Sequence, residues 1–515
     1  MSKWSSEFLY DLPCSYSYYK EENPLYLKHL LTSKGFSFPD IENGNALEIG
    51  FGKGISISMH AATSTTKWMG TEFNPSLVNT AKRVAKECNI EAELTSESLE
   101  EFARRTDLPK FDLICLHGVW SWISARDQET IIDIADRHLK DGGIFYVSYN
   151  CTVGMINFEP VRHLMHMYNQ KMNPSNMADH ERLNRVATYL LPIVRANPSF
   201  VVSQPDFAER ITAALASNTN EFLSENLNTH WSMSHFSDMS HRLERADLGF
   251  MCSALGNDNL DFANLTPEQI EFIEPLLGTV MYEDTRDFIV NQRFRHDIYV
   301  KGGIPLSPNE YLATFRSLNI LMIDPADSFN YTITGRNGEV ELDKAVYGPL
   351  IEILADNEPH NVGAILDIIL SSNQELAFDQ VANAINTLVY ANICAPCVAA
   401  ESVDEEKMDR CRRYNFNTIE NYTDSPTVFM CSPLTQGGIA VDPLQVKLLG
   451  IYLQNPECHD LALVEAILTL CVSGEVNFNN DGQALSEDEL INVVSNYVAN
   501  FKAVMLPYYK KLMFF

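Results

Sequence analysis

A short glycine-rich segment near the amino terminus has the residue types and the spacing to bind a small charged ligand. It runs from Ala46 to Gly54 and reads ALEIGFGKG, in which the apolar residues of a buried strand precede a turn. Gly50, Gly52 and Gly54 lack a Cβ, so they permit a sharp turn and let a ligand carboxylate or phosphate approach bare backbone amides. The segment therefore predicts a ligand site directly after the first strand.

The glycine spacing argues against a nicotinamide-binding fingerprint. That fingerprint reads GxGxxG and would require glycine at the position of Ile55, whereas this chain reads GxGxG. It also does not call for an acid inside the strand, where this chain has Glu48. A tight connection without a ligand is the alternative for a glycine turn taken alone, and the order of strand, acid and turn weighs against it.

The elements that position this turn alternate between short apolar runs and amphipathic stretches, which is typical of strand and helix units on a parallel sheet. Asn74 and Pro75 supply the cap and the first turn of a helix that is predicted to end at Cys88. After Asn150 the pattern becomes mainly helical. The predicted strands are 46–49, 67–71, 91–94, 111–116 and 142–148.

Further regions follow the predicted sheet. A boundary is expected near Gly303, before the linker IPLSPNE. Asn337 and Gly338 predict a β-hairpin, and three helical patterns follow over 343–394, which suggests a winged-helix-like module. A long helix is expected near the carboxyl end, after a capping box that begins at Ser486.

The GxGxG turn, the preceding Glu48 and the acid Glu72 at the end of the second strand resemble the class I S-adenosylmethionine-dependent methyltransferase family. The resemblance implies an α/β fold with a Rossmann-like domain, whose seven-stranded sheet is mostly parallel, and S-adenosylmethionine as the cofactor. It also implies that the glycine turn faces the methionyl part of this cofactor. Glu72 is the first-choice ribose ligand, because a carboxylate can accept hydrogen bonds from both hydroxyls of a vicinal diol.

The resemblance also assigns a residue after the third predicted strand, and the position of His117 after the fourth indicates a role there. The family places a polar or acidic side chain against the adenine amino group, and Ser96 or Glu97 occupies that position, with Glu97 the better acceptor. His117, beside Gly118 at a strand end, is expected to position the cofactor or to accept a proton. The predicted cofactor-binding residues are Glu48, Gly50, Gly52, Gly54, Glu72, Ser96, Glu97, His117 and Gly118.

Longer blocks resemble a subgroup, the methyltransferases with a regulatory domain, which includes bacterial protein-lysine methyltransferases. These blocks are FDLICLHGVWSWI, GGIFYVSYN, FLSENLNTHWSMSHFSDMSHRLERADLGFMCSA, RDFIVNQRFRHDIYV and, more loosely, FMCSPLTQGGIAVDPLQ, so the likeness covers nearly the whole chain. It implies methyl transfer to lysine side chains of a protein substrate, and a homodimer. The predicted domains are a cofactor-binding domain (1–215), a helical regulatory segment that could complete the sheet (216–303), a winged-helix-like middle domain (304–398) and a C-terminal helical domain (399–515).

Methyl transfer is an in-line displacement, so the protein must align acceptor and cofactor and exclude water. A lysine acceptor, with a reference pKa of about 10.4, must first lose its proton, and aromatic surroundings favour the neutral amine. Packing of the amino-terminal arm, or of a core or lid, is the alternative for the aromatic candidates. The predicted catalytic residues are His117, Tyr149 and Asn150, and the predicted substrate-binding residues are Tyr16, Tyr18, Tyr19, Trp120 and Trp122.

The composition restricts the partners of this protein. Lysine and arginine number 38 against 68 aspartate and glutamate residues, and the formal charge of -30 repels phosphate backbones and disfavours nucleic-acid binding. No apolar run reaches the roughly 18 residues of a membrane helix, so no membrane contact is expected. The 11 cysteines are scattered, which is typical of a reducing compartment and predicts a cytoplasmic protein.

Two groups of metal-ligand residue types are interpreted as structural. His163 and His166 lie three positions apart on a predicted helix, without a third ligand in register. Cys394 and Cys397 form a lone CxxC, and the other cysteines are too irregularly spaced to complete a zinc site. We therefore expect no metal.

Two other functions fit the same motifs. A methyltransferase of small molecules would have a closed, narrow pocket in place of an open groove. An inactive regulator would bind the cofactor and use its winged-helix-like part to contact a partner, but the retained glycines and Glu72 weigh against this reading.

Overall fold

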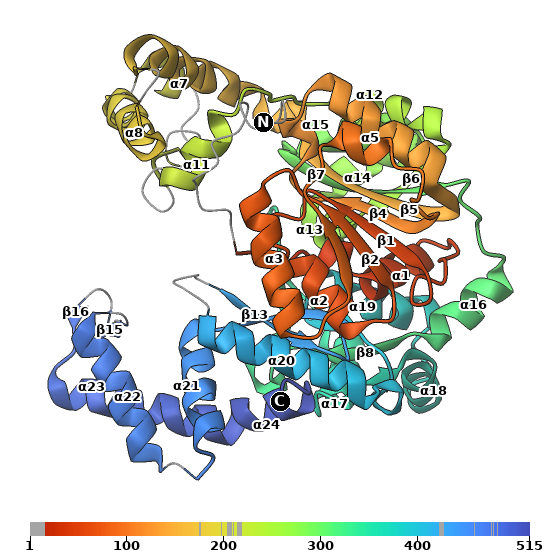
Figure 1. Cartoon of the computed structure of the whole chain (residues 1–515). Coiled ribbons are helices and arrows are strands. Elements are labelled where there is room, and N and C mark those ends of the chain that lie inside the picture. The colour runs from red at the N-terminus through yellow and green to blue at the C-terminus, as the bar shows by residue number, and fades with distance from the viewer. Residues whose placement is uncertain are drawn as a thin grey trace.

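A seven-stranded sheet organises the first three hundred residues of the computed structural model (Figure 1). The structure describes residues 16–515 except 175–176, 197, 203–208, 210, 214–218, 422–426, 458, 475, 477 and 481–482. The strand order is β3-β2-β1-β4-β5-β7-β6; the first five strands run parallel, and β7 is antiparallel to both of its neighbours. The strands are β1 (Asn45–Ile49), β2 (Lys67–Thr71), β3 (Ala92–Thr95), β4 (Phe111–Leu116), β5 (Leu139–Asn150), β6 (Leu248–Ser253) and β7 (Phe294–Lys301).

The sheet confirms the predicted fold class and the five predicted strands; the bounds of β1 and β3 differ by one residue from the predicted 46–49 and 91–94, and those of β5 differ more. β5 extends from Leu139 to Asn150, beyond the predicted 142–148 at both ends. Gly142 has a positive φ of 77°, a backbone conformation that is common for glycine in turns. The strand nevertheless continues through an irregularity in its pairing with β4, and at its other end it pairs with β7 as far as Asn150.

Helices cover both faces of this sheet because consecutive strand residues point to opposite sides. Leu113 of β4 packs in the core formed with α1 (Pro24–Ser33), α2 (Ile55–Thr63) and α3 (Pro75–Glu87). Its neighbour Ile114 packs in the core formed with α4 (Leu99–Ala103), α5 (Ala125–His138) and α12 (Phe236–Leu243). The predicted cap of α3 is confirmed, since the Asn74 side chain accepts a hydrogen bond from the Ser76 N–H.

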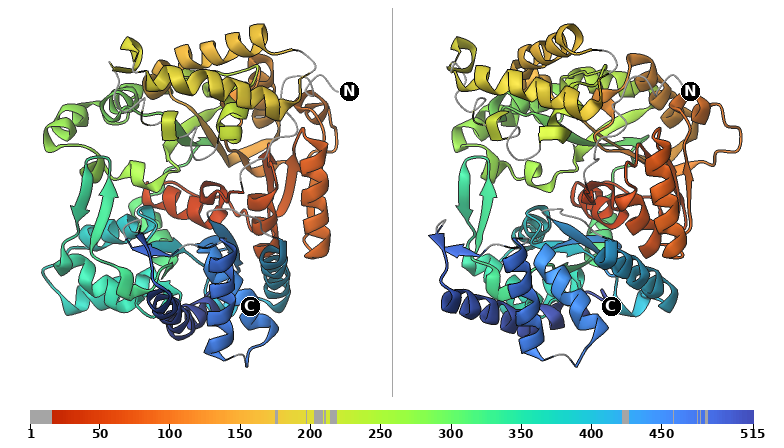
Figure 2. Two further views of the ribbon diagram at one scale, coloured as in Figure 1. Left: turned by 90° about the vertical axis from the view of Figure 1, so that its left-hand side faces the viewer. Right: turned by 60° about the vertical axis from the view of Figure 1, so that its left-hand side comes forward.

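After β5 the chain leaves the sheet and forms a helical unit with its own core (Figures 1 and 2). Its main helices are α7 (Glu159–Met172), α8 (Asp179–Arg195) and α11 (Thr219–Asn226). The chain returns at Ser234, which bridges to Cys151 just after β5. β6 and β7 then complete the sheet, with α14 (Pro267–Ile273) and α15 (Val280–Val290) between them.

The middle region confirms the predicted hairpin and the three helices. The hairpin joins β9 (Thr332–Gly335) to β10 (Gly338–Glu341), and the helices are α17 (Lys344–Leu354), α18 (Val362–Ser372) and α19 (Phe378–Tyr390). They lie beside a three-stranded antiparallel sheet of β11 (His360–Asn361), β8 (Asn319–Met322) and β12 (Cys394–Pro396), which follows α16 (Pro308–Ser317). The sequence did not predict this sheet, because strands of two to four residues are too short to display a period of two.

The C-terminal region packs against α2, the helix that begins at the glycine turn. Arg410 Nε donates to the Ala62 carbonyl at 3.0 Å, and Lys407 Nζ pairs with Glu42 at 2.9 Å. Figure 1 shows α20 lying below α2. The capping box at Ser486 is confirmed. The elements are α20 (Glu405–Asn421), β13 (Val428–Ser432), β14 (Gly437–Val441), α21 (Pro443–Gln454), α22 (Asp460–Ser473), β15 (Asn479–Asn480), β16 (Gln483–Ala484), α23 (Glu487–Asn500) and α24 (Leu506–Lys511).

The helical unit of α7, α8 and α11 and the C-terminal helices α21–α23 lie at opposite ends of the molecule, and in Figure 1 both lie to the left of the large sheet (Figures 1 and 2). Among the residues that the structure describes, no helix combines the length and the apolar composition that a membrane span requires.

Candidate active site

The glycine turn has the backbone conformation that only glycine adopts easily. Gly50, Gly52 and Gly54 have φ values of 77°, 55° and 76°, and Gly54 is the N-cap of α2. A Cβ on Gly50 would lie 2.5 Å from Cγ2 of Val119, which is closer than carbon atoms pack. The turn therefore brings bare backbone to the carboxyl end of β1, where a ligand can approach it.

Glu72, at the end of β2, holds this turn in place. Its Oε2 accepts a hydrogen bond from the Gly52 N–H at 3.0 Å, and its Oε1 accepts one from the Asn74 N–H at 2.9 Å. The carboxylate is buried, and burial raises its pKa to about 7. Each oxygen retains a second acceptor position, so the carboxylate can still take hydrogen bonds from a ribose diol.

A pair of buried acids lies on the α2 side of the turn. Glu48 belongs to β1, and Glu22 belongs to the short 3-10 helix η2 (Lys20–Glu22). Both oxygens of Glu22 and Oε2 of Glu48 are buried without a hydrogen bond of ordinary geometry, although Ser56 and Cys115 lie beside Glu22. Burial, and then the carboxylate of Glu72, raises the pKa of Glu48 to about 8. Burial, and then the carboxylate of Glu48, raises the pKa of Glu22 well above its ordinary value. Such a pair needs a shared proton or a cationic ligand.

A chain of imidazole and phenol groups crosses the carboxyl end of the sheet beside these acids. His117 Nδ1 lies 2.8 Å from Tyr146 Oη, and Tyr146 Oη lies 3.1 Å from His296 Nδ1. The ring of Tyr19 stacks on His117 with 3.6 Å between centroids. Burial lowers the pKa of both histidines, that of His117 well below its ordinary value, so both rings are neutral at physiological pH.

Tyr149 lies on the opposite face of β5 from Tyr146, because side chains alternate along a strand. Its hydroxyl donates to Asp297 Oδ2 at 2.7 Å, within a buried ion cluster centred on Arg295. This position does not support the predicted catalytic role of Tyr149. Asn150 lies at the strand end, where its N–H donates to Ser121 Oγ at 2.8 Å and its buried Nδ2 has no hydrogen bond.

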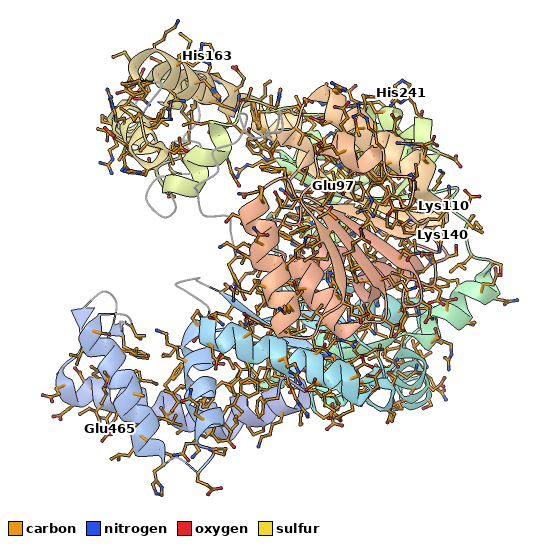
Figure 3. All side chains as sticks on the ribbon, in the orientation of Figure 1. Glu97, Lys110, Lys140, His163, His241 and Glu465 are labelled. Carbon is orange, nitrogen blue, oxygen red and sulfur yellow. The ribbon has the colours of Figure 1, made fainter. Side chains whose placement is uncertain are left out.

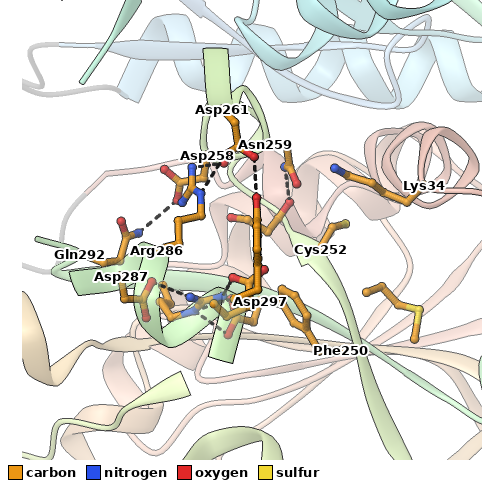
Figure 4. Close-up of a pocket in the computed structure, with 15 residues that line it drawn as sticks. Lys34, Phe250, Cys252, Asp258, Asn259, Asp261, Arg286, Asp287, Gln292 and Asp297 are labelled. Carbon is orange, nitrogen blue, oxygen red and sulfur yellow. Dashed lines mark hydrogen bonds and ion pairs between the residues drawn. The ribbon is translucent and has the colours of Figure 1, made fainter. Parts of the chain in front are cut away.

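The ion cluster lines a pocket at the β6 edge of the sheet (Figure 4). Arg295 pairs with Asp297 at 3.0 Å, with Asp287 at 2.6 Å and with Glu283 at 2.8 Å. Cys151, the first residue after β5, donates its thiol to Asp287 at 3.4 Å. The cluster therefore supports the strand end that carries Asn150.

The predicted aromatic substrate contacts separate in the structure. Only Tyr19 joins the imidazole chain. Tyr18 lies half-buried between His60 and Phe429, and Tyr16 packs against α20 of the C-terminal region, where it contacts Tyr414. These positions favour the packing alternative for both tyrosines.

The two tryptophans also differ. Trp120 has no exposed surface and lies under the guanidinium of Arg242, 5.0 Å from its ring centroid, so its contacts are those of a core residue. Trp122 is half-buried, and its carbonyl accepts a hydrogen bond from Asn228 at 3.2 Å.

The remaining predicted cofactor residues lie along the same end of the sheet. Gly118 has a φ of 66°, and its N–H donates to Ser148 Oγ at 2.7 Å. Ser96 is exposed and Glu97 half-buried after β3, where the Glu97 carbonyl accepts from the Thr71 hydroxyl, one residue before Glu72. Figure 3 shows Glu97 at this end of the sheet, and Lys110 and Lys140 at the starts of β4 and β5.

Three residues of this site were not predicted from the sequence: Glu22, Tyr146 and His296. The alternation along GGIFYVSYN could have separated Tyr146 from Tyr149. His296 stands in the distinctive block RFRHDIYV, but its strand partner could not be known. Glu22 precedes the sheet and carries no motif.

Among the described residues, no group of three or more histidine, cysteine, aspartate or glutamate side chains is arranged to hold a metal ion. His166 bonds to the Asn226 carbonyl at 3.1 Å, and Figure 3 places His163 on the helical unit, away from the sheet. Cys394 and Cys397 are buried thiols that form no disulfide.

Comparison with known families agrees with this geometry. Residues 46–143 match the family model described as a methyltransferase domain, and residues 219–301 match a predicted methyltransferase regulatory domain. The strand order, the glycine turn and these matches show a class I S-adenosylmethionine-dependent methyltransferase domain and a methyltransferase regulatory domain in this chain. Its cofactor is S-adenosylmethionine, and the glycine turn, Glu72 and the unpaired buried acids fit this cationic nucleoside.

Relatives match over most of their length. An uncharacterised protein of Synechocystis is 27% identical over 99% of both chains, and one of Rickettsia prowazekii is 23% identical over 72% of this chain and 66% of that protein. Among solved structures, PKMT2 from Rickettsia typhi in complex with AdoHcy has a TM-score of 0.69 at 16% identity, covering 96% of this chain and 99% of that one. This likeness shows that the matched 96% of the chain, which includes the C-terminal half, shares that fold.

Proposed function

We propose that this methyltransferase transfers methyl groups to lysine side chains of a protein substrate. The observation that carries the proposal is the neutral chain His117–Tyr146–His296 beside the cofactor site, since a lysine ammonium must lose a proton before it can be methylated. The name of the similar Rickettsia typhi protein, PKMT2, denotes a protein-lysine methyltransferase and supports the same acceptor. The homodimer and the cytoplasmic location stay predictions.

The bound cofactor supplies an electrophilic methyl group, and the residues of the chain prepare the acceptor. With the proton of His117 on Nδ1 and donated to Tyr146 Oη, its Nε2 is the acceptor for the lysine proton. Tyr146 in turn donates to His296 Nδ1, so the charge that develops on His117 is shared along the chain. Tyr19, stacked on His117, shields this step from water.

Removing the hydroxyl of Tyr146 is expected to slow turnover while cofactor binding persists. We expect Tyr146→Phe to lower kcat about tenfold at neutral pH and to shift the pH–rate profile, because His117 loses its link to His296. The matched control is Tyr149→Phe, on the same strand but the opposite face, which should leave the shape of the pH profile unchanged. Equal pH profiles for the wild type and both variants would contradict the role of the chain.

The acceptor is tested with a protein mixture whose lysines are either free or blocked. The purified full chain and radiolabelled S-adenosylmethionine are incubated with both mixtures, the blocked one prepared by reductive dimethylation. We expect label only in the mixture with free lysines, and methyl-lysines after acid hydrolysis. Equal labelling of both mixtures, or label lost in mild base as from carboxyl methyl esters, would disprove a lysine acceptor. Tight cofactor binding without labelling of either mixture would favour a regulator or a small-molecule enzyme.

A further inference from the structure

We propose that Glu22 is a cofactor-binding residue that, together with Glu48, binds the α-ammonium group of S-adenosylmethionine, and that cofactor binding releases a proton from this acid pair. Glu22 lies outside both segments that match family models. The inference concerns cofactor binding alone and does not depend on the methyl acceptor.

The segment that carries Glu22, residues 18–23, is held over the site from both ends; we call it the strap. The Tyr19 N–H donates to Ser56 Oγ at 2.9 Å, in the first turn of α2, and the Tyr19 ring stacks on His117. At the other end, Asn23 caps α1 and donates to the Thr435 carbonyl at 3.0 Å. These contacts fix Glu22 between the start of α2 and the strands β1 and β4.

The acid pair lacks a protein cation. In the part of the chain that the structure describes, Glu22 and Glu48 take part in no salt bridge, and three of their four oxygens are buried without a hydrogen bond. Lys20, on the same short helix, donates instead to Asn392 at 3.0 Å and lies over the ring of Tyr26. Two carboxylates buried together without a cation are stable only if they hold a proton.

The geometry assigns this pair to the amino-acid end of the cofactor. Glu72 marks the ribose side of the glycine turn at β2, whereas Glu48 lies on β1 and Glu22 reaches toward Cys115 of β4. The methionyl part of the cofactor carries an ammonium group, and replacing a shared proton by this group satisfies both carboxylates. The sulfonium is the competing cation, and S-adenosylhomocysteine, which has the ammonium but no sulfonium, separates the two.

The expected pH dependence of cofactor affinity follows from the raised pKa values of the two acids. The raised pKa of Glu48, about 8, and that of Glu22 leave the ligand-free pair protonated at neutral pH. A bound cation lowers these pKa values, so affinity should rise with pH by up to about tenfold per unit while one proton is released. Burial also raises the pKa of Cys115 and Tyr146, so both stay neutral in this range. The titratable groups that face Glu22 are Glu21, Glu48, Cys115 and Tyr146, with Glu72 beyond Glu48.

Calorimetry with two nucleosides tests the proposal. The full chain is titrated at neutral pH with S-adenosylhomocysteine and with 5′-methylthioadenosine, which lacks the amino-acid part, in buffers of different ionisation enthalpy. We expect about one proton to be released with S-adenosylhomocysteine and none with 5′-methylthioadenosine. Glu22→Gln should weaken the binding of S-adenosylhomocysteine about tenfold and leave that of 5′-methylthioadenosine unchanged, and the double variant Glu22→Gln with Glu48→Gln should abolish the proton release.

The neighbouring Glu21→Gln is the matched control and should retain the proton release. Binding of S-adenosylhomocysteine to the wild type without proton release would overturn the proposal. The proposal would also be overturned if Glu22→Gln weakened the binding of both nucleosides equally, because that result indicates a structural role for the strap. Binding of 5′-methylthioadenosine also reports that each variant has folded.

Discussion

Glu72→Ala is expected to weaken the binding of S-adenosylmethionine by at least about a hundredfold. The carboxylate offers two acceptor positions to the ribose, and hydrogen bonds to a charged group contribute about 1.5–3 kcal/mol each, where about 2.8 kcal/mol corresponds to a hundredfold in affinity. The same substitution removes the acceptors of the Gly52 and Asn74 N–H groups. The glycine turn therefore loses its support together with its ligand contact.

Isothermal calorimetry on the full chain measures this effect. Glu93→Ala is the control, because Glu93 is an exposed carboxylate on β3 that pairs with Arg105 at 2.8 Å, away from the glycine turn. We expect its affinity to match that of the wild type. If the affinity of the Glu72→Ala protein for S-adenosylmethionine were within about threefold of the wild-type affinity, another residue would have to bind the ribose.

Arg295→Met is expected to lower the free energy of unfolding by about 3–5 kcal/mol, a much larger loss than that of a surface ion pair. The guanidinium is 4% exposed and neutralises two acids that are more deeply buried, Asp287 at 1% and Asp297 at 0%. Removing one partner from a buried ion cluster leaves charges without compensation, which costs more than the pair contributes when intact. Urea denaturation measures the loss, and Arg83→Met, which breaks an exposed pair with Glu87, is the control with an expected change below about 0.5 kcal/mol.

The loss of stability in Arg295→Met should become larger as the pH rises. Burial already raises the pKa of Asp287 to about 6 and raises that of Asp297, and loss of the cation raises both further. The folded variant then binds protons that the unfolded chain does not hold, so its stability falls as pH rises through these values. We expect a larger loss at about pH 8 than at about pH 5.5. A loss that is equal at both pH values would mean that the acids find other partners.

The parts of the fold that the sequence predicted depend on interactions within a few residues or within one strand. The Asn74 cap of α3, the Asn337–Gly338 hairpin and the capping box at Ser486 are of this kind. Local patterns also located the glycine turn and the five parallel strands, because the central strands are buried on both faces and read as short, mainly apolar runs. These features suffice for the fold class and the cofactor.

Only the tertiary structure decided which side chains meet at the site. Tyr146 meets His117 and His296 because β5 lies between β4 and β7, and a register shifted by one residue would have turned its side chain to the opposite face of the sheet. Glu22 reaches Glu48 because Asn23 is anchored to Thr435, which is 412 positions away in the chain. No local pattern encodes contacts over such separations, since they depend on how whole elements pack. The sequence by itself therefore determined the class of enzyme and its cofactor, and packing determined which acids and bases surround them.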